Sequence, residues 1–484
     1  MTKKSILSLL QGSLMCCLAV LFTACDDVFG NEDNPMSAYL SMSDKPVTLK
    51  AGDTYRRKAV SVTSAVVEYS SSKTDVATVD NEGLVTAKAE GTTTITATAT
   101  GYSSQNGKKI YQPASVSYVV TVTPATVAVT GLTLNKANLR FDKNVLTAQT
   151  LTATVLPLEA TDKSVTWTSS DPTVATVDAN GQVTPKAKGI ATITATTTDG
   201  GKKATSTVYV YDKIHNINTD GDADVTTNES WLIEGDVTTS VSKSITIGAG
   251  ATVTLNGINI TKGIECSGDA TIILADGSTN TVTVPIFNAG IKIGDGATTT
   301  LTINGETAGT GTLTAQGGMS AAGIGTDRNG SGGNIVINGG TVTAIGGNNG
   351  AGIGTGRAQD VSITCGDITI NGGTVTATGV DNGAGIGTGL SSGTGASNTC
   401  GAIMIGTGVT MVTATKGSSA PNSIGKGSID PINGGNQVCG TITFGTAAVF
   451  NGSAWSSDPM AAGPYGGLTL AISGNTWTLT PVAP

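Results

Sequence analysis

The sequence has little of what most active sites are built from. It contains one histidine, His215, and aromatic residues make up 4% of its 484 positions. A lone histidine supports no Ser-His-Asp or Cys-His arrangement unless partners converge on it from elsewhere in the chain. Charged residues are 13%, about half of the ~25% found in an average globular protein. We therefore expect His215 to be an ordinary structural residue, and the composition does not favour catalysis.

Glycine is abundant, with 66 residues, and threonine, valine, alanine and isoleucine fill much of the rest. Glycine shows no strict three-residue period, which excludes a collagen-like chain. Many β-branched residues between tight turns favour strands over helices. The composition therefore predicts an all-β protein.

Residues 1–24 have the layout of an export signal, with a positive start, an apolar run at 14–22 and small residues before the cleavage point. The apolar run is too short to span a bilayer stably. The stretch LFTAC at 21–25 resembles a bacterial lipobox, although Phe22 stands where leucine is usual. The resemblance implies that Cys25 carries lipid and that the mature protein is bound to a membrane through this anchor.

Acidic residues follow Cys25 within the tether at 25–41, namely Asp26, Asp27, Glu32 and Asp33. This arrangement resembles the surface-export tag of Bacteroidota lipoproteins, which implies the outer membrane with the protein facing the cell exterior. Loss of the signal's two lysines leaves 25 basic and 35 acidic residues, a net charge of −10. Such a chain repels nucleic acid, so we expect no nucleic-acid partner.

An internal repeat with an offset of 98 residues marks two similar domains. Residues 67–98 and 165–196 are identical at 19 of 32 positions, and both contain VATVD, then G-x-V-T, then G-x-x-x-I-T. A period near 100 residues predicts whole domains. The pattern resembles the group 2 bacterial immunoglobulin-like family, whose modules act as surface spacers or adhesive elements. This implies β-sandwiches at 42–123 and 126–211, with one buried aromatic residue each, Tyr69 and Trp167.

From about residue 214 the sequence repeats on a shorter scale. Residues 332–356 recur at 365–389, and each unit holds short alternating stretches between Gly or Asn-Gly turns, without a helical period. Such units stack as coils of parallel strands about 4.8 Å apart. The region resembles the glycine-rich right-handed β-helices of bacterial surface proteins, some of which bind plant-type polysaccharide. We thus expect two Ig-like β-sandwiches followed by a right-handed parallel β-helix at 214–484, capped by a hairpin about Gly474-Asn475.

The repeat also predicts columns of matching side chains. The expected inward pairs are Ile335 with Ile368, Ile337 with Ile370, Val342 with Val375, and Ile353 with Ile386. Asn338 and Asn371 should occupy a turn in the left-handed conformation and bond along their column. Three cysteines, each opening a strand, should form a column of buried free thiols, with a fourth thiol elsewhere: Cys365, Cys400, Cys439 and, separately, Cys266.

Two polar clusters are candidate sites. Asp220, Asp222 and Asp224 alternate in a spacing that can gather oxygen ligands around Ca²⁺. The stretch lacks the glycine and the final acid of an EF-hand, so the alternative is a solvated acidic linker. No other cofactor is indicated.

Arg328 and Arg357 each follow a GAGIG-type turn by the same interval, so they should lie on neighbouring coils. Two such guanidiniums repel unless an anion or a carboxylate lies between them. The alternatives are an ion-pair network with Asp327 and Asp360, or a small site for an acidic sugar. The same loop edge would add Asn348, Asn349, Asp381 and Asn382, and two C-terminal aromatic residues would either stack on sugar rings or cover the cap: Trp455 and Tyr465.

The function that we expect is non-catalytic. Ig-like spacers would present the β-helix of a monomeric cell-surface lipoprotein for polysaccharide binding or for adhesion to a host or bacterial surface. One alternative is a β-helical polysaccharide lyase or glycoside hydrolase, which needs converging carboxylates or basic groups that the repeat does not reveal. The other alternative is a purely structural surface stalk.

Overall fold

The computed structural model describes residues 36–37, 40–61, 66–99, 111–294, 296, 298–452 and 461–482, and these residues form strands and turns with no helix. The all-β class is confirmed. Within the same residues no helix is long and apolar enough to cross a membrane. The signal peptide, Cys25 and most of the tether lie outside the described residues. The chain divides into two compact units, one ending at 132 with additions at 154–165 and 197–202, and the other containing 133–153, 166–196 and 203–484.

The first sandwich packs a four-stranded sheet against a three-stranded one. The larger sheet has the order β3 (Val47–Lys50), β11 (Ala114–Thr123), β9 (Gly91–Ala99), β6 (Val67–Ser71), and the smaller β4 (Thr54–Arg56), β8 (Leu84–Ala87), β7 (Ala77–Val79). Alternate residues of these strands point inward, and Ile95, Val120 and Val85 are fully buried between the sheets. Tyr69 is partly buried against this core, and its hydroxyl accepts a hydrogen bond from the Ala59 N–H at 2.6 Å.

The second sandwich repeats this arrangement. Its sheets have the orders β13 (Asn138–Asp142), β20 (Lys203–Tyr211), β19 (Gly189–Thr197), β16 (Val165–Ser169) and β14 (Gln149–Thr150), β18 (Gln182–Pro185), β17 (Ala175–Val177). Gly181 explains the glycine of the G-x-V-T motif. Its φ is +79°, and a Cβ there would lie 2.9 Å from the Trp167 ring and 2.4 Å from the Leu151 carbonyl oxygen. Trp167 is partly buried against the core, as its repeat position predicts.

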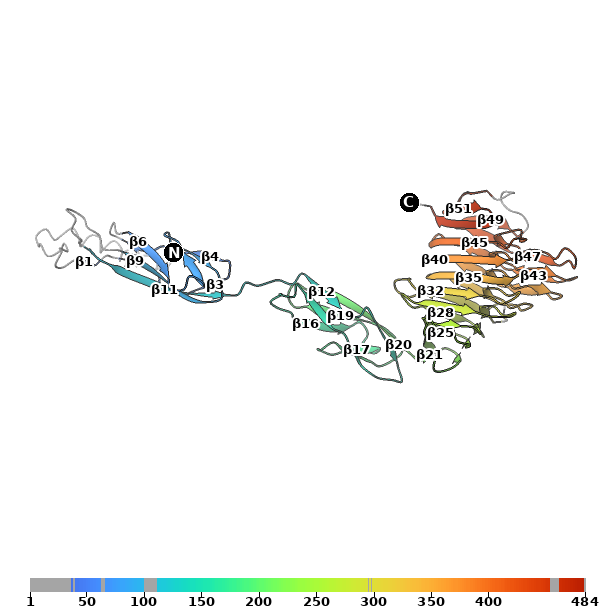
Figure 1. Ribbon diagram of the computed structural model, residues 1–484, viewed down its shortest axis with the longest axis horizontal. Coiled ribbons are helices and arrows are strands. Elements are labelled where there is room, and N and C mark those ends of the chain that lie inside the picture. The colour runs from blue at the N-terminus through green and yellow to red at the C-terminus, as the bar shows by residue number, and fades with distance from the viewer. Residues whose placement is uncertain are drawn as a thin grey trace, which may run out of the picture. The chain divides into compact units, whose positions relative to one another are not determined.

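The β-helix consists of three parallel sheets whose strands stack coil upon coil from β21 toward β51 (Figure 1). The first sheet holds β21 (Lys213–Asn216), β23 (Ser230–Glu234), β25 (Ala251–Asn256), β28 (Ala270–Leu274), β31 (Thr300–Gly305), β34 (Asn334–Ile337), β39 (Ile368–Ile370), β44 (Ile403–Ile405), β48 (Thr441–Phe444) and the antiparallel β49 (Ala447–Asn451). The second holds β22 (Ala223–Val225), β24 (Ile245–Ile247), β27 (Ile264–Cys266), β30 (Ile291–Ile293), β33 (Ile324–Gly325), β36 (Ile353–Gly354), β41 (Ile386–Gly387) and β46 (Ile424–Gly425). The third holds β26 (Asn259–Ile260), β29 (Thr279–Thr283), β32 (Thr312–Gln316), β35 (Thr341–Asn348), β40 (Gly373–Val380) and β45 (Val409–Thr415).

The four expected aliphatic pairs are confirmed. Each pair occupies adjacent strands in register, and all eight side chains are fully buried in one continuous core. The recurring threonine of the GIGTG turn is buried as well. The Thr326 and Thr355 hydroxyls accept hydrogen bonds from the N–H groups of Gly356 and Gly389, both at 2.9 Å, which ties each coil to the next. The repeat is therefore explained by the packing of the coil.

The asparagine column is confirmed in its bonding and corrected in its backbone. Asn371 Nδ2 donates to Asn338 Oδ1, and Asn338 Nδ2 donates to Asn304 Oδ1, both at 2.9 Å. The left-handed conformation lies instead at the second following glycine, with φ of +80° at Gly340 and +79° at Gly373. The Asn-Gly-Gly turn offers glycine for that conformation, and glycine adopts it at lower cost than asparagine.

The thiol column is confirmed, but its strand assignment is wrong. Cys365, Cys400 and Cys439 are in register, buried and free, and Cys266 is a separate buried free thiol. They close the strands β38 (Ile363–Cys365), β43 (Ser397–Cys400) and β47 (Asn436–Cys439) rather than opening the strands that follow. These three strands form a side sheet in the later coils, because the chain makes an additional excursion between the second and first sheets.

The expected hairpin closes the C-terminal end of the coil. β51 (Leu468–Ser473) and β52 (Thr476–Pro481) pair antiparallel about Gly474-Asn475, and β52 pairs antiparallel with β45. The edge of the third sheet is thus covered by a strand of opposite direction, and β50 (Gly463–Tyr465) lies beyond it. This ending blunts the edge-to-edge association that an open coil invites.

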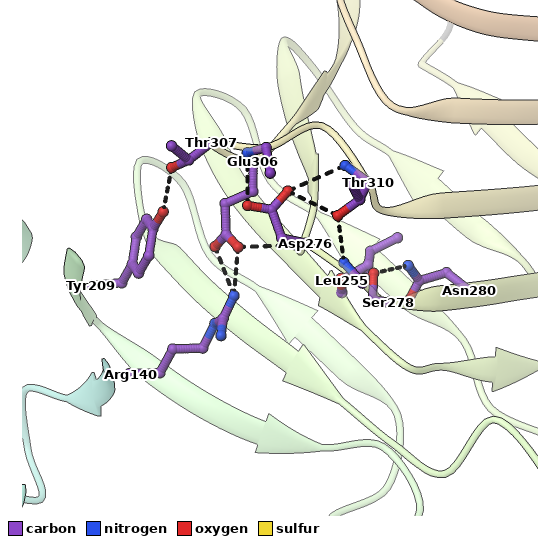
Figure 2. A network of polar contacts seen from close by, with 11 residues as sticks. Arg140, Tyr209, Leu255, Asp276, Ser278, Asn280, Glu306, Thr307 and Thr310 are labelled. Atoms are coloured by element: carbon purple, nitrogen blue, oxygen red, sulfur yellow. Dashed lines mark hydrogen bonds and ion pairs between the residues drawn. The ribbon is translucent and has the colours of Figure 1, made fainter. Parts of the chain in front are cut away.

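Within the second unit, the sandwich is joined to the coil by partly buried polar contacts. Arg140 of β13 donates two hydrogen bonds to Glu306, at 2.8 and 2.6 Å, and the Tyr209 hydroxyl bonds Thr307 at 2.9 Å (Figure 2). At the crossover between the two domains, the buried Asp212 carboxylate accepts from Lys143 at 2.6 Å and from Lys188 at 2.9 Å. The junction of the sandwich and the β-helix thus buries two carboxylates, Glu306 and Asp212, each paired with a cation that is more exposed.

Candidate functional site

One corner of the β-helix, between the third and second sheets, has an unusual backbone. Four successive coils each place a non-glycine residue with positive φ there: Phe287 (+56°), Ser320 (+67°), Asn349 (+67°) and Asp381 (+52°). Small polar residues tolerate this conformation, whereas for a bulky residue it costs about 1–2 kcal/mol. We call these four residues the corner column. Phe287 is its strained member, and such strain is concentrated at functional positions.

Phe287 is part of an exposed aromatic and apolar surface. Its side chain is 39% exposed, and Ile286 and Met319, which pair across adjacent coils, are 56% and 55% exposed. The Arg328 guanidinium lies over the Phe287 ring at 4.7 Å and donates to Gln359 Oε1 at 2.5 Å. We call Ile286, Phe287, Met319 and Arg328 the Phe287 platform. A cation on one part of an aromatic face leaves a surface with both apolar and charged character.

A polar hollow of about 230 Å³ continues from the platform along the chain, since Asn288 follows Phe287 and Asp327 precedes Arg328. Its other lining residues include Lys262, Glu265 and Lys292. Lys292 Nζ lies 2.9 Å from Glu265 Oε1 and 3.6 Å from Asp327 Oδ2, so one lysine joins two carboxylates.

The two carboxylates of the hollow are in different environments. Burial raises the pKa of Asp327 above its ordinary value, although a hydrogen bond from the Ala289 N–H at 2.6 Å and the charge of Lys292 act in the opposite direction. Glu265 is more exposed than Asp327. A carboxyl with a raised pKa beside a second carboxylate is a combination that acid–base sites use.

The two predicted arginines lie on neighbouring coils, where the Asn329 N–H donates to the Arg357 carbonyl oxygen at 3.0 Å. Among the described residues neither forms an ion pair with Asp327 or Asp360, so of the two alternatives the ion-pair network is wrong. The reason is that Gln359 and Ser392 bond the two guanidiniums, and Asp327 is engaged by Lys292. Arg357 Nη2 donates to Ser392 Oγ at 3.3 Å. The Nε atoms of both arginines are buried without a partner in the described part of the chain.

The other residues expected at the loop edge belong to the same corner. Asn382 Nδ2 donates to Asn349 Oδ1 at 2.6 Å, and Asp381 directly precedes Asn382. Asn348 lies at a bulge where β35 and β40 shift register, opposite Val380. The structure therefore brings these four residues together, one to two coils from the Phe287 platform.

The C-terminal aromatic residues do not join this corner. Tyr465 packs edge-on against Phe444 with ring centroids 6.4 Å apart, and its hydroxyl donates to the Ala461 carbonyl oxygen at 2.9 Å. It therefore covers the apolar end of the coil, the second of the two roles considered for it. Trp455 lies outside the described residues.

The three aspartates considered for calcium are engaged separately. Asp220 accepts from the Asn216 N–H at 2.9 Å, and Asp222 accepts from the Ser244 N–H at 2.9 Å. Asp224 lies exposed on β22, so the stretch belongs to the first coil and is not a linker. In the portion of the chain that the structure describes, no three acidic, cysteine or histidine side chains form a group that could hold a metal ion. The structure therefore gives calcium no converging ligand set here.

Sequence reasoning missed Phe287, Glu265 and Lys292. The signal for Phe287 was a departure from the repeat, because the loop VPIFNAG at 284–290 has an aromatic residue where the later loops GGMSAAG and GGNNGAG have serine and asparagine. Glu265 and Lys292 carry no such signal, because isolated charges on alternating strands look like ordinary solvent-facing positions.

Comparison with known families supports the domain content. Residues 40–110 and 142–208 match the bacterial Ig-like domain (group 2). The two sandwiches are domains of this type. Residues 335–357 and 368–390 match the beta helix repeat.

Three relatives share stretches about as long as one sandwich. They are an Ig-like virion protein of Serratia phage KSP90 (46% identical over 94 residues), an alpha-L-arabinofuranosidase of Bifidobacterium longum (45% over 104) and a lacto-N-biosidase of Bifidobacterium bifidum (47% over 91). The matched stretches cover 19%, 21% and 19% of this chain. They cover only 35%, 9% and 8% of the relatives, so this chain spans a minor part of each.

Proposed function

We propose that this chain is a cell-surface protein that binds carbohydrate at the corner of its β-helix. The observation that carries the proposal is Phe287, an exposed aromatic ring held in a strained backbone conformation beneath an arginine. The apolar face of a sugar ring packs on an aromatic side chain, while its hydroxyls need donors and acceptors nearby. The polar hollow offers both, through Lys262, Lys292, Glu265 and Asn288.

The arrangement favours an extended glycan that carries acidic sugar units. Arg328 adds a positive charge to a hollow in which two lysines face two acids, and the corner column continues past the platform as Ser320, Asn349 and Asp381. Polar groups therefore recur along the coil at about 4.8 Å per turn. A linear polymer lying along the column would meet a new set of them at each coil.

The rest of the chain fits a tethered receptor. We propose that Cys25 carries the lipid, that the protein faces outward from the outer membrane, and that the Ig-like domains act as spacers. The occurrence of similar stretches in two bifidobacterial proteins named as glycosidases supports an association with carbohydrate. This similarity does not imply a catalytic activity for this chain, because less than a tenth of each of those proteins is matched.

The test is a glycan array probed with residues 25–484, followed by calorimetry on each glycan that binds. Phe287→Ala and Arg328→Ala should each weaken binding about tenfold, a loss of about 1.4 kcal/mol. Met404→Ala is the matched control, because Met404 is a similarly exposed apolar residue on the first sheet, away from the corner. Affinity that is unchanged in Phe287→Ala contradicts the proposal, as does an array to which no glycan binds. The purely structural stalk would then be the better description.

A second candidate function is glycoside hydrolysis, favoured by the Asp327–Lys292–Glu265 arrangement alone. Asp327, with its raised pKa, would protonate the glycosidic oxygen, and Glu265 would activate the water that adds to the anomeric carbon. Chromatography of each bound glycan after prolonged incubation tests this. Shortened products that vanish with Asp327→Asn, while the glycan still binds, would make the protein an enzyme; unchanged glycan would leave a binder.

A further inference from the structure

A second cavity, of about 680 Å³, lies within the second unit between the sandwich and the outer face of the first sheet of the coil. Ile190, Tyr209 and Tyr211 line it from β19 and β20, and Ile273 and Asn304 line it from β28 and β31. Its volume is in the range of small-molecule sites, which occur preferentially where domains meet. The cavity shares no lining residue with the polar hollow.

The cavity is preformed by the loop that follows β31. In later coils the turn after the first sheet is a short Asn-Gly-Gly, as at 338–340, whereas here the chain runs NGETAGTG at 304–311. Glu306 in this loop has a side chain that is 3% exposed, and it accepts from Arg140 and from the Asp276 N–H at 3.0 Å (Figure 2). Thr310 bonds Asp276 and Gly277, which fixes the other end of the loop. The cavity wall therefore needs no rearrangement before a ligand enters.

The groups that face the cavity are apolar, neutral or already engaged in ion pairs. The Tyr209 and Tyr211 rings lie nearly parallel, 14° apart with centroids at 6.4 Å, and form an aromatic wall. Glu306 is neutralised by Arg140, and Lys188 at the rim is bound to Asp212, so both charges are already paired. A charged ligand would find no unpaired counter-charge among these residues.

Two polar side chains in the lining, Tyr211 and Asn304, can form hydrogen bonds with a ligand. The Tyr211 hydroxyl is buried, in a residue that is 4% exposed, and the side chains of Thr254 and Arg140 lie within hydrogen-bonding reach of it. Asn304 is the end of the amide column: its Oδ1 accepts from Asn338, and its Nδ2 donates to no described residue. An acyl chain in the cavity would offer no acceptor to the Asn304 amide, and burying an unpaired polar group is unfavourable.

We propose that this junction cavity binds an uncharged carbohydrate of one or two rings. The sugar's apolar face would pack on Tyr209 and Tyr211, and its hydroxyls would meet Asn304 Nδ2, the Tyr211 hydroxyl and the side chain of Thr254. The site is separate from the corner, so this proposal stands or falls without the function proposed above. Together the two sites would let one molecule hold a glycan at two points.

The experiment is titration calorimetry of residues 25–484 with glucose, galactose, cellobiose, lactose and N,N′-diacetylchitobiose. At least one of these sugars should bind, and Ile190→Trp, which fills the mouth of the cavity from an exposed position, should abolish the heat. Thr92→Trp is its control, because Thr92 is also exposed and occupies the same position in the first sandwich, 98 residues earlier. No binding by any of the five sugars, or equal binding by the Ile190→Trp variant, overturns the proposal.

The amide column supplies a second matched pair. Asn304→Ala should weaken the same binding about tenfold, whereas Asn371→Ala, two coils away in the same column and outside the cavity, should leave it unchanged. Phe287→Ala should also leave it unchanged, which separates this site from the corner. Equal losses in Asn304→Ala and Asn371→Ala would mean that the column acts through stability alone, and would contradict the proposed contact.

Discussion

At the scale of single residues, Phe287 combines a strained backbone with an exposed aromatic ring that could contact a ligand. A positive φ of 56° strains its backbone, and its ring is left 39% exposed under Arg328. Glycine adopts this conformation without the steric penalty that a Cβ causes. We therefore expect Phe287→Gly to be more stable than Phe287→Ala by about 1 kcal/mol, although both lose the ring. Urea denaturation of the two variants measures the difference directly.

The comparison with Ser320 gives the control for this prediction. Ser320 occupies the same corner one coil later with a φ of +67°. The free energy of unfolding of Ser320→Gly should therefore exceed that of Ser320→Ala by a similar margin. Glycine variants that are less stable than the alanine variants at both positions would show that the corner is not strained. Phe287 would then carry no backbone strain that a function has to account for.

At the scale of elements, the sequence predicts what repeats and misses what departs from the repeat. The pairs such as Ile335 with Ile368 were predictable, because a fixed period and a buried face determine which side chains stack. The thiol column was predictable for the same reason, but the excursion that carries Cys365 was not, since no regular period marks it. The loop at 304–311 and Phe287 were missed because a single insertion or substitution in one repeat unit cannot be told from ordinary divergence between units.

The thiol column leads to a prediction about reactivity. Burial raises the pKa of Cys266 to about 12, and hydrogen bonding to its neighbours together with burial raises that of Cys400. A hydrogen bond from Cys400 lowers the pKa of Cys439, so among these thiols it should react first. Because the thiolate is the reactive form, the native mature chain with Cys25→Ser should resist Ellman's reagent at pH 8.

The measurement is the number of thiols modified before and after denaturation. Four should react in guanidinium chloride, and mass spectrometry of briefly treated native protein should place any early adduct on Cys439. Rapid modification of Cys266 in the native protein would contradict the closed interior of the coil.

Asp212, at the crossover from β20 to β21, allows a prediction about pH. Burial raises its pKa, but hydrogen bonds from Lys143, Lys188 and the Ser230 N–H outweigh this and hold the pKa below the ordinary 3.8. A lowered folded-state pKa means that the carboxylate stabilises the fold above the ordinary value, and that this stability is lost as the pH falls through the lowered pKa. Asp212→Asn should thus cost on the order of 1–2 kcal/mol at pH 7 and progressively less in acid.

Denaturation followed by tryptophan fluorescence, to which Trp231 on the neighbouring β23 contributes, measures this difference at pH 7 and at several acidic values. Asp224→Asn is the control, because Asp224 is exposed on the first coil, and we expect its effect to be near zero throughout. A cost for Asp212→Asn that stays constant with pH would mean that the carboxylate charge does not stabilise the junction.

At the scale of the whole molecule, the second unit carries both proposed carbohydrate sites. The junction that forms the 680 Å³ cavity also buries the carboxylates of Glu306 and Asp212 and holds the partly buried Arg140 against Glu306. A spacer module alone would not need a buried ion pair with the domain that it presents. On the two proposals above, the second Ig-like domain lines a carbohydrate site in addition to acting as a spacer.

Cys25 is the residue that we propose holds this unit at the cell surface. We expect Cys25 to be lipidated, because it follows a short apolar run and a Thr-Ala pair, and several acyl chains make anchoring effectively permanent. Cells expressing the chain with Cys25→Ser should not incorporate alkyne-palmitate into it, and the protein should leave the membrane fraction. Cys16→Ser and Cys17→Ser are controls that should keep the label. Label that persists in Cys25→Ser would place the lipid elsewhere. A separate experiment treats intact cells with protease: if the Asp26→Ala, Asp27→Ala double variant is no longer cleaved, the acidic pair directs display on the cell exterior.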